Sequence, residues 1–523
     1  MLAAGLAPEE AVLLARCCTA RGVLFHDPPP PPLRRLRWRA WRSVWLGRWN
    51  ETKTFATAFK SLLARPARPE GQRARALFLS HAAFWRDRAT ELGATEEYEH
   101  YFDRLIPETE ARGALLPWVV AVGPRAAFRR RGARERLRDW LSLGRRGPFE
   151  HINRHVSFSV AWATLGIGAE MRRAWRTLRQ SPALGALCSH RGVRFDDLAL
   201  PDLAGTLLLQ VPWAVRSYEE MARALETIQP AIAVLYAESS GWGRAAVAAC
   251  RAAGVPTLGI QHGILYPTYY SYRHDPDEAD CPRPDRTAVF GEAARRFLID
   301  AGHYPPESLV VTGSPKFDEL LQRAERWDRA RLRAGLGVGE DESLLVLASR
   351  FHPIRETHHA AGGALPALVR AVDGLEGVHC LIKPHPAEPS DPYERVLREA
   401  GARRTRVLPP RAELLELLHA ADVLVTVESL SAVEALVLGR PVVVLETPNH
   451  LRDLVQAGVA VGVAKGADPA GALWSVLRDP DAREQLEAAR QRYLGELAMG
   501  VDGGAAARIL DLVRAMARPP DTP

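Results

Sequence analysis

The stretch IAVLYAESSGWGRAAVAACRAAGVPTLGIQHG, residues 232–263, predicts a strand, a helix and a second strand in succession. Its two apolar runs have the length of buried strands, and the Ala-rich run between them has helical spacing. Strands joined through a helix run parallel, so the stretch predicts a βαβ unit in a parallel sheet. Glu238 and His262 each follow one of these strands. Because open α/β sheets bind ligands at the carboxyl ends of their strands, both residues are candidates for a functional site.

The same alternation of strands and helices continues on both sides of this unit. Earlier strands are expected in 76–87 and 115–124, and later ones at 287–291, 309–315, 343–350, 378–386, 406–410, 422–429 and 441–446. The expected fold class is α/β, with two Rossmann-like domains. We expect four segments: an N-terminal helical and basic appendage with a linker (1–70), a first domain with a helical insertion (71–275), a second domain (276–480), and C-terminal helices that pack back toward the N-terminal half (481–523).

The composition is that of a globular protein. A length of 523 residues exceeds one ordinary core, and 47% hydrophobic with 25% charged residues argues against disorder. The six cysteines have no metal-ligand spacing, which favours reduced thiols in the cytosol. The N-terminus is acidic where a secretory signal is basic, and the least polar longer segment, 198–215, reads better as core than as a membrane span. We therefore expect a cytoplasmic protein.

Residues 33–49, LRRLRWRAWRSVWLGRW, interleave arginine with tryptophan. Such a segment can lie at a membrane interface, with its rings among the headgroups and its guanidiniums on anionic lipid. A second interpretation is a solvated helix face whose tryptophans pack on the protein. Nucleic-acid binding is a third, although no recognition module accompanies the charge and we expect no nucleic-acid partner. The first interpretation would place the protein peripherally on the inner face of the membrane.

Several strands of the second half also end in polar residues. Lys383 and His385 follow one strand in CLIKPHPAEP, and Ser429 and Ser431 follow another in VESLSAVEALVLGRP. A serine at the start of a helix, with the helix dipole and free N–H groups, makes an anion site of the kind that phosphates occupy. Glu434 could accept from ribose hydroxyls. The alternative is a plain capping box, since Ser431 and Glu434 have its spacing.

The ordered motifs QHG, GSPKFD, KPHP and VESLSAVEALVLGRPVV resemble those of the CDP-glycerol glycerophosphotransferases and related capsule or surface-polysaccharide transferases. The resemblance covers roughly 230–450. It implies a GT-B enzyme, with two Rossmann-like domains facing across a cleft and the nucleotide donor held mainly by the C-terminal one. It also implies a nucleotide-activated donor and a glycan or lipid-linked acceptor as partners.

Carried over residue by residue, the resemblance implies roles for the two histidines. The family's HG histidine falls on His262 and its HP histidine on His385, which are implicated in catalysis or in binding of the donor phosphate. The family's Gly-x-Pro-Arg-like turn falls on Gly313, Pro315 and Lys316, with Lys where the family usually carries Arg. The serine pair that contacts the donor pyrophosphate falls near Ser429 and Ser431, where the family's Thr-Asp-Tyr-Ser-Ser is Val-Glu-Ser-Leu-Ser here.

The chemistry of such a transfer sets two tasks. The departing nucleotide phosphate needs positive potential, which Lys316, Arg350, Lys383 and His385 could supply together with a helix N-terminus. The acceptor hydroxyl needs a base, for which His262 and Glu238 are the candidates. Gly263 would allow a tight turn beside His262. Three tyrosines that follow would form either an aromatic wall for the acceptor or packing for the interdomain hinge: Tyr266, Tyr269 and Tyr270.

Residues 234–263 also resemble the corresponding unit of non-hydrolysing UDP-N-acetylglucosamine 2-epimerases, where an acid follows the strand as Glu238 does here. Those enzymes have a Glu-Ala-Gly-Leu-Arg run where this chain has QHGILYP. An Asp275-x-Asp277 pair reads as a linker turn, so we expect no metal and no cofactor. We expect a metal-independent transferase of a glycosyl or polyol-phosphate group, with a sugar-nucleotide 2-epimerase or a non-catalytic scaffold in polysaccharide biosynthesis as alternatives.

Overall fold

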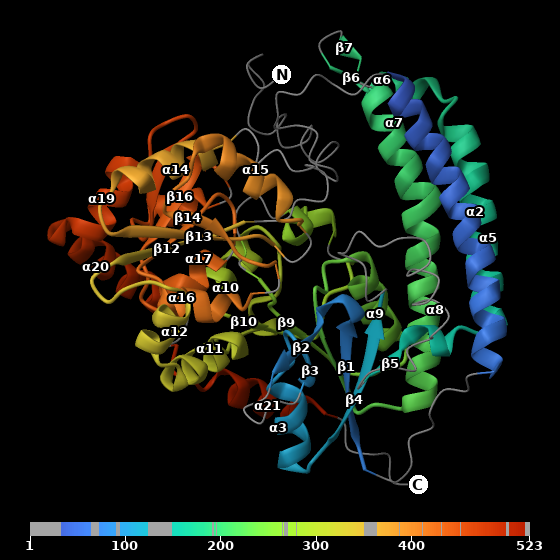
Figure 1. The fold of residues 1–523 in the computed structure, drawn as a ribbon. Helices are drawn as coiled ribbons and strands as arrows, with labels where there is room; N and C mark the ends of the chain where they lie inside the picture. Colours follow the sequence, from blue (N-terminus) through green and yellow to red (C-terminus); the bar gives the residue numbers. More distant parts are fainter. Residues whose placement is uncertain are drawn as a thin grey trace.

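The computed structural model describes residues 33–63, 73–89, 95–123, 149–190, 193–194, 196–263, 265, 270–278, 280–349, 363–385, 388–410, 412–429, 431–449, 451–497 and 501–517. Two parallel sheets organise the chain, and a bundle of long helices stands beside the first of them (Figure 1). The α/β class expected from the sequence is confirmed, as is the parallel pairing of the strands around the 232–263 unit. No helix in the described part of the chain is both long and apolar enough to cross a bilayer.

The first sheet has seven strands in the order β11-β10-β9-β8-β1-β4-β5, and every pair of neighbours is parallel. Its core is formed by fully buried apolar side chains of β1 and β8. Residue 236 of β8 lies opposite residue 260 of β9, so these two strands end side by side. The strands are β1 (Arg75–His81), β4 (Leu116–Val122), β5 (Glu150–His151), β8 (Ile232–Tyr236), β9 (Thr257–Ile260), β10 (Arg286–Val289) and β11 (Leu309–Val311).

Helices and a short hairpin accompany the first sheet. The hairpin, β2 (Trp85–Ala89) with β3 (Thr95–Glu99), is antiparallel and follows the carboxyl end of β1. The helices are α3 (Leu105–Arg112), α9 (Gly241–Ala252), α10 (Glu292–Asp300) and α11 (Pro315–Arg326).

The second sheet has six parallel strands in the order β14-β13-β12-β15-β16-β17. Relative to the chain this is the order 3-2-1-4-5-6 of a Rossmann fold. The strands are β12 (Ser343–Ala348), β13 (Val378–Lys383), β14 (Thr405–Val407), β15 (Val423–Thr426), β16 (Val442–Thr447) and β17 (Val461–Ala464). The helices are α12 (Arg329–Gly335), α14 (Leu365–Gly374), α15 (Asp391–Ala400), α16 (Leu414–Ala420), α17 (Ser431–Val437), α18 (Arg452–Gln456) and α19 (Ala470–Arg478).

The change of sheet falls later in the chain than the sequence indicated. We expected the second domain to begin at 276, but β10 and β11 extend the first sheet and the second sheet begins only at β12. The reason lies in pairing: Arg286–Val289 adds beside β9, with Thr287 opposite Gly259, and β11 then adds beside β10. Short apolar runs in succession do not reveal which sheet each one joins.

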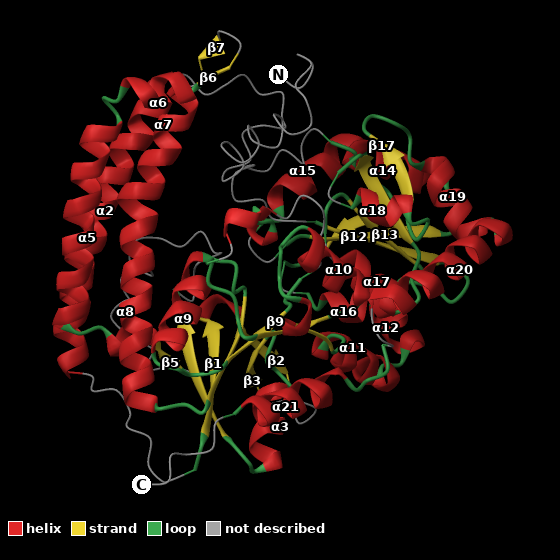
Figure 2. Cartoon of the chain, turned by 180° about the vertical axis from the view of Figure 1, so that it is seen from behind, coloured by secondary structure: helices red, strands yellow, loops and turns green. Residues whose placement is uncertain are grey.

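The end of the chain returns to the first half. Helix α20 (Pro480–Leu497) contacts α10, α17 and α19, whereas α21 (Ala505–Met516) contacts α3, α11 and β8. Four apolar side chains of α21 are buried in the core of the first sheet: Ala506, Ile509, Leu510 and Val513. The last described helix therefore belongs to the first core in space, although it follows the second in sequence (Figure 2).

A helical bundle forms the outer side of the first half. Helix α2 (Leu33–Leu63) packs along α5 (Phe158–Leu178) and α7 (Asp196–Gly205), so this part of the expected appendage belongs to the bundle. Helix α7 continues through a π-helical turn into α8 (Val211–Ile228), which contacts both α5 and α9. Figures 1 and 2 both place α2 and α5 on the side away from the sheets. The tip carries α6 (Pro182–Leu187) and a small antiparallel pair, β6 (Ser189–His190) with β7 (Val193–Arg194).

Candidate functional site

The first sheet has the same strand order as the second, with one further strand at its edge. In chain order its strands read 7-6-5-4-1-2-3, so the order reverses between β1 and β8. Ligands of open α/β sheets bind outside the carboxyl ends at such a reversal. There the backbone N–H of His81 donates to the hydroxyl of Tyr236 over 2.8 Å, which ties the two strand ends together.

Glu238 lies two residues beyond the end of β8 and is 1% exposed. Burial raises the pKa of its carboxyl to about 7, against hydrogen bonds from its own backbone and from Tyr272 that lower it. Its Oε2 atom is buried and has no hydrogen-bond partner among the described residues. A buried carboxyl with an unsatisfied oxygen and a pKa near neutrality suits proton transfer.

His262 lies two residues beyond the end of β9, the strand that neighbours β8 in the sheet. Its ring is 6.1 Å from that of Tyr236 and 5.8 Å from that of Tyr101, the latter edge to face. Burial lowers the pKa of the imidazole to about 4, so the ring is neutral at neutral pH. Its Nδ1 atom is buried and has no hydrogen-bond partner in the part of the chain that the structure describes.

Gln261 holds the start of the His262 loop. Its side-chain oxygen accepts from the backbone N–H of Phe290 over 2.8 Å, and its amide donates to the carbonyl of Gly263 over 2.8 Å. Gly263 itself has no left-handed φ, and a Cβ added there would meet no described atom within 4 Å. The Gln261 side chain thus fixes the start of the loop, and no left-handed φ at Gly263 requires a glycine there.

Glu99, at the end of β3, adds a second buried carboxyl that the sequence analysis missed. Its Oε1 accepts from the hydroxyls of Tyr236 over 2.7 Å and Ser80 over 3.1 Å. Its Oε2 accepts from the backbone N–H groups of Tyr101 and Phe102 over 2.7 and 2.6 Å. Burial outweighs these bonds and raises the pKa of the carboxyl to about 7.

His81 ends β1 and was also missed. Its Nδ1 accepts from the backbone N–H of Ala83 over 3.1 Å, which leaves the hydrogen of the neutral ring on Nε2. Burial, and then the neighbouring His151, lower its pKa to about 4. The rule that selected His262, a polar residue directly after a buried strand, applies equally to His81 in LFLSHAAF.

The second sheet reverses its order between β12 and β15. The hydroxyl of Thr426 donates to the carbonyl of Ala348 over 2.9 Å and so joins the two strand ends. A cavity of about 40 Å³ opens beside them, lined by Leu347, Ala348, Ser349, Ala364, Leu365, Tyr393, Val427, Glu428 and Leu445. This apolar hollow with a few polar groups lies where a Rossmann fold holds its ligand.

His385 follows β13, next to this reversal. Its backbone N–H contacts the Ser349 hydroxyl at 2.8 Å and the Glu388 carboxylate at 3.2 Å. Glu388 also accepts from Ser349 and from the hydroxyl of Tyr393, the latter over 3.0 Å. Lys383 is 4% exposed, and its ammonium donates to the carbonyls of Pro384 and Pro410 over 2.8 Å each. The lysine thus braces the loop that carries His385.

Ser429 and Ser431 lie after β15, at the start of α17, as the sequence indicated. Their hydroxyls are 2.8 Å apart, and the Ser429 hydroxyl accepts from the backbone N–H of Ser431 over 3.3 Å. The N–H of Ser429 in turn donates to Thr426 over 3.0 Å. This chain of bonds places both hydroxyls beside the carboxyl end of β15.

Two expected ligand residues, Lys316 and Glu434, contact each other. The ammonium of Lys316, in the first turn of α11, forms an ion pair with the carboxylate of Glu434 on α17. The pair lies beside a shared cluster that includes Phe317 and Val433, so it joins the helix that follows the first sheet to the second domain. Gly313 has a φ of +81°, and a Cβ there would lie 3.1 Å from that of Ala505, so it serves the packing of α21.

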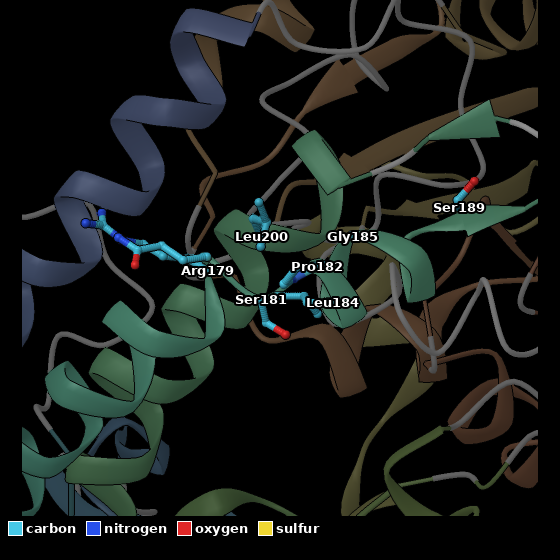
Figure 3. Close-up of a pocket in the computed structure, with 8 residues that line it drawn as sticks. Arg179, Ser181, Pro182, Leu184, Gly185, Ser189 and Leu200 are labelled. Atoms are coloured by element: carbon cyan, nitrogen blue, oxygen red, sulfur yellow. The ribbon is translucent and has the colours of Figure 1, made fainter.

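The structure thus groups Glu238 and His262 at the first sheet, and His385, Ser429 and Ser431 at the second. Arg350, Tyr266 and Tyr269 lie outside the described residues, as does the side chain of Tyr270. Among the described residues, no three His, Cys, Asp or Glu side chains converge as metal ligands would. A larger cavity of about 450 Å³ lies at the tip of the bundle, away from both reversals, where Arg179 and Ser181 contribute to its lining (Figure 3).

The fold is similar to those of several solved structures. UDP-GlcNAc 2-epimerase from Neisseria meningitidis, solved with UDP-GlcNAc bound, superposes with a TM-score of 0.52 at 14% identity, over 85% of this chain and 100% of its own. The MnaA structure with UDP from S. aureus gives 0.51 at 13% identity, over 86% and 100%. A variant of the wall teichoic acid polymerase TagF gives 0.49 at 12% identity, over 92% and 97%.

Neither the family models nor the curated proteins that were searched contain a match to the chain. At identities of 13–14% the first two of these structures establish the fold alone. That fold is the one the sequence indicated, an α/β protein with two Rossmann-like domains of the GT-B kind.

Proposed function

We propose that the protein is a metal-independent transferase that moves a glycosyl or polyol-phosphate group from a nucleotide-activated donor to a surface-polysaccharide or lipid-linked acceptor. One observation carries the proposal: both sheets have Rossmann order, and polar side chains gather at the reversal of each. Ser429, Ser431 and His385 would bind the donor at the second sheet, and Glu238 and His262 would act on the acceptor at the first.

The reaction needs one proton transfer. The acceptor hydroxyl attacks the anomeric carbon or the phosphorus of the donor, the bond to the nucleotide phosphate breaks, and the hydroxyl proton leaves. In our proposal the neutral imidazole of His262 accepts that proton, because burial leaves the ring unprotonated at neutral pH. Glu238 is the second candidate for the base, since its carboxyl has a pKa of about 7.

The departing phosphate would be stabilised mainly by hydrogen-bond donors. Lys383 donates to two carbonyls and Lys316 pairs with Glu434, so neither ammonium is the leading candidate for the phosphate. The hydroxyls of Ser429 and Ser431 remain at the end of β15, with Arg350 as the cation that the resemblance adds. Oriented donors of this kind stabilise charge that develops during a reaction.

A second function of the same fold is sugar-nucleotide 2-epimerisation. The observation that favours it is that the UDP-GlcNAc 2-epimerase from Neisseria meningitidis superposes over its whole length. Against it stands the sequence after β9, where QHGILYP replaces the Glu-Ala-Gly-Leu-Arg run of the epimerases that this unit resembles. A non-catalytic scaffold is disfavoured, because the polar residues at the reversals of both sheets would then have no ligand.

An acceptor-dependence assay distinguishes these functions. The protein is incubated with UDP-GlcNAc, other UDP- and GDP-sugars, or CDP-glycerol in EDTA, with and without a glycan acceptor fraction, and proton NMR follows the donor. A transferase releases nucleotide only when the acceptor is present, and the His262→Ala variant does not. Conversion of UDP-GlcNAc to its 2-epimer without acceptor would assign the chain to the second function, and an unchanged donor throughout would contradict both.

A further inference from the structure

Helix α2 has its large apolar side chains on the outside. Trp41, Trp45 and Trp49 are 64%, 53% and 56% exposed, and Phe59 is 62% exposed. A spacing of four residues puts the tryptophans on one stripe, and residue 59 falls five helical turns after residue 41, at the same angle. The interpretation in which these tryptophans pack on the protein is therefore wrong.

The inward side of α2 carries small and polar residues. Its buried members are Ser43, Gly47, Glu51, Thr54, Thr57, Ala58 and Ser61. A Cβ on Gly47 would lie 2.4 Å from the carbonyl oxygen of Leu208, so the helices approach too closely there for any side chain. Small residues between helices and large apolar ones outside reverse the usual pattern of a water-exposed helix.

The exposed apolar surface is concentrated on the bundle. Ten large apolar side chains of the described residues are exposed, and all except Trp474 belong to α2, α5, α6 or α8. Trp162 of α5, 63% exposed, contacts Phe55 of α2 edge to face at 5.1 Å, so the stripe continues across the two helices. Figure 1 shows both helices on the outer side of the bundle. A patch of this kind marks an interaction surface.

The charge of α2 indicates the chemistry of the partner. Its sequence has eight Arg and Lys residues and one acid, Glu51, which gives 8 − 1 = +7. That acid is paired with Arg172 of α5 and is buried. Arg42 and Arg48 are exposed beside the tryptophan stripe. Two copies of the chain meeting through this face would bring two strongly basic helices together, which disfavours self-association.

We propose that the outer face of α2 and α5 docks on the surface of an anionic phospholipid bilayer. The helix is about 46 Å long at 1.5 Å per residue and would lie along the interface. Its indole rings would enter the headgroup region, where tryptophan is favoured, and its arginines would contact lipid phosphates. This inference does not depend on the proposed reaction.

Vesicle co-sedimentation of the full chain tests the docking. Phosphatidylcholine vesicles are compared with vesicles that also contain phosphatidylglycerol, at low and high salt. We expect binding to the anionic vesicles and its loss at high salt. The Trp41→Ala/Trp45→Ala/Trp49→Ala variant should bind about 100-fold more weakly, because three indoles leave the interface together. Trp474→Ala removes an equally exposed indole from α19 and should bind like the wild type.

Two further measurements keep the result decisive. Thermal unfolding should be unchanged in the triple variant, since exposed indoles contribute little to the core. Mass photometry without lipid reports whether the chain self-associates. Wild-type protein that binds neither kind of vesicle, or a triple variant that binds as tightly as the wild type, overturns the proposal. A wild-type dimer that the triple variant converts to monomer, without vesicle binding, would instead identify the face as a self-interface.

Discussion

The rings of His262 and Tyr236 lie 6.1 Å apart at the ends of two neighbouring parallel strands. The Tyr236 hydroxyl donates to Glu99 and accepts from the backbone N–H of His81. One tyrosine thus connects the proposed base with the strand end at the reversal of the first sheet. The position of the His262 ring depends on this packing as well as on the Gln261 bonds that hold its loop.

Replacement of His262 tests its role as a base. In His262→Ala we expect turnover to fall about 10²–10⁴-fold while donor affinity barely changes, because only the proton transfer is lost. Steady-state kinetics and donor titration of the same preparation measure the two effects. A parallel fall in donor affinity would assign the histidine to phosphate binding, and full activity with lower thermal stability would make it structural.

The pH profile identifies which group accepts the proton. A base must be unprotonated, so kcat/KM falls as the pH drops through the pKa of the base. If His262 is the base, the acid limb lies near pH 4, because burial lowers its pKa to about 4. An acid limb near pH 7 would identify Glu238 as the base, because burial raises the pKa of its carboxyl to about 7. Glu238→Gln should remove a limb at that pH.

Glu99 makes the stability of the fold dependent on pH. Its folded pKa is raised from 4.5 to about 7, so between these values the unfolded carboxyl has lost its proton while the folded one keeps it. The free energy of unfolding contributed by Glu99 is therefore fully present below pH 4.5 and falls as the pH rises to 7, by up to about 3 kcal/mol.

Urea unfolding of Glu99→Gln and of the wild type isolates the contribution of Glu99 to the free energy of unfolding. The histidines with lowered pKa act in the opposite direction, since they lose stability as the pH falls, so only the difference between the two proteins is informative. The variant should gain stability relative to the wild type from pH 4.5 to 7. A difference that does not vary with pH would mean that Glu99 is ionised in the folded protein throughout.

The Lys316–Glu434 pair is expected to stabilise the junction between the two halves. A double-mutant cycle of Lys316→Met and Glu434→Gln should give a coupling of roughly 1 kcal/mol in the free energy of unfolding, since both side chains are largely buried. Nucleotide affinity should be nearly the same in all four proteins. If Glu434→Gln weakens nucleotide binding and Lys316→Met does not, Glu434 contacts the ribose as the sequence first suggested.

Much of this arrangement could be predicted from local sequence. Parallel strands follow from βαβ spacing, and Glu238 and His262 follow from their positions after buried strands. His81 was accessible by the same rule and was overlooked because its segment reads as a strand breaking into a loop. Glu99 lies in TEEYE, where nothing distinguishes it from a solvated acid, and only the contact with Tyr236 reveals it.

Other features depend on tertiary pairing that no local pattern encodes. From its sequence, Arg286–Val289 could join either sheet. Its pairing with β9 places it in the first sheet. Lys316 and Glu434 are 118 residues apart in sequence, so each looked like a free ligand group. The face of α2 that meets the bundle was unpredictable for a related reason: its small residues, not its tryptophans, lie inward.

Nucleotide binding tests the central claim most directly. Isothermal titration calorimetry of CMP, CDP, UDP and GDP in EDTA is performed on the wild type and on Ser429→Ala/Ser431→Ala. Ser217→Ala, which changes a partly exposed serine of the helical bundle, is the control. We predict that at least one nucleotide binds without metal, and that the double variant binds it more weakly by roughly 1 kcal/mol or somewhat more for each hydrogen bond lost, with the control unchanged. If no nucleotide binds, or if the double variant binds as tightly as the wild type, the proposed donor site at the end of β15 is contradicted.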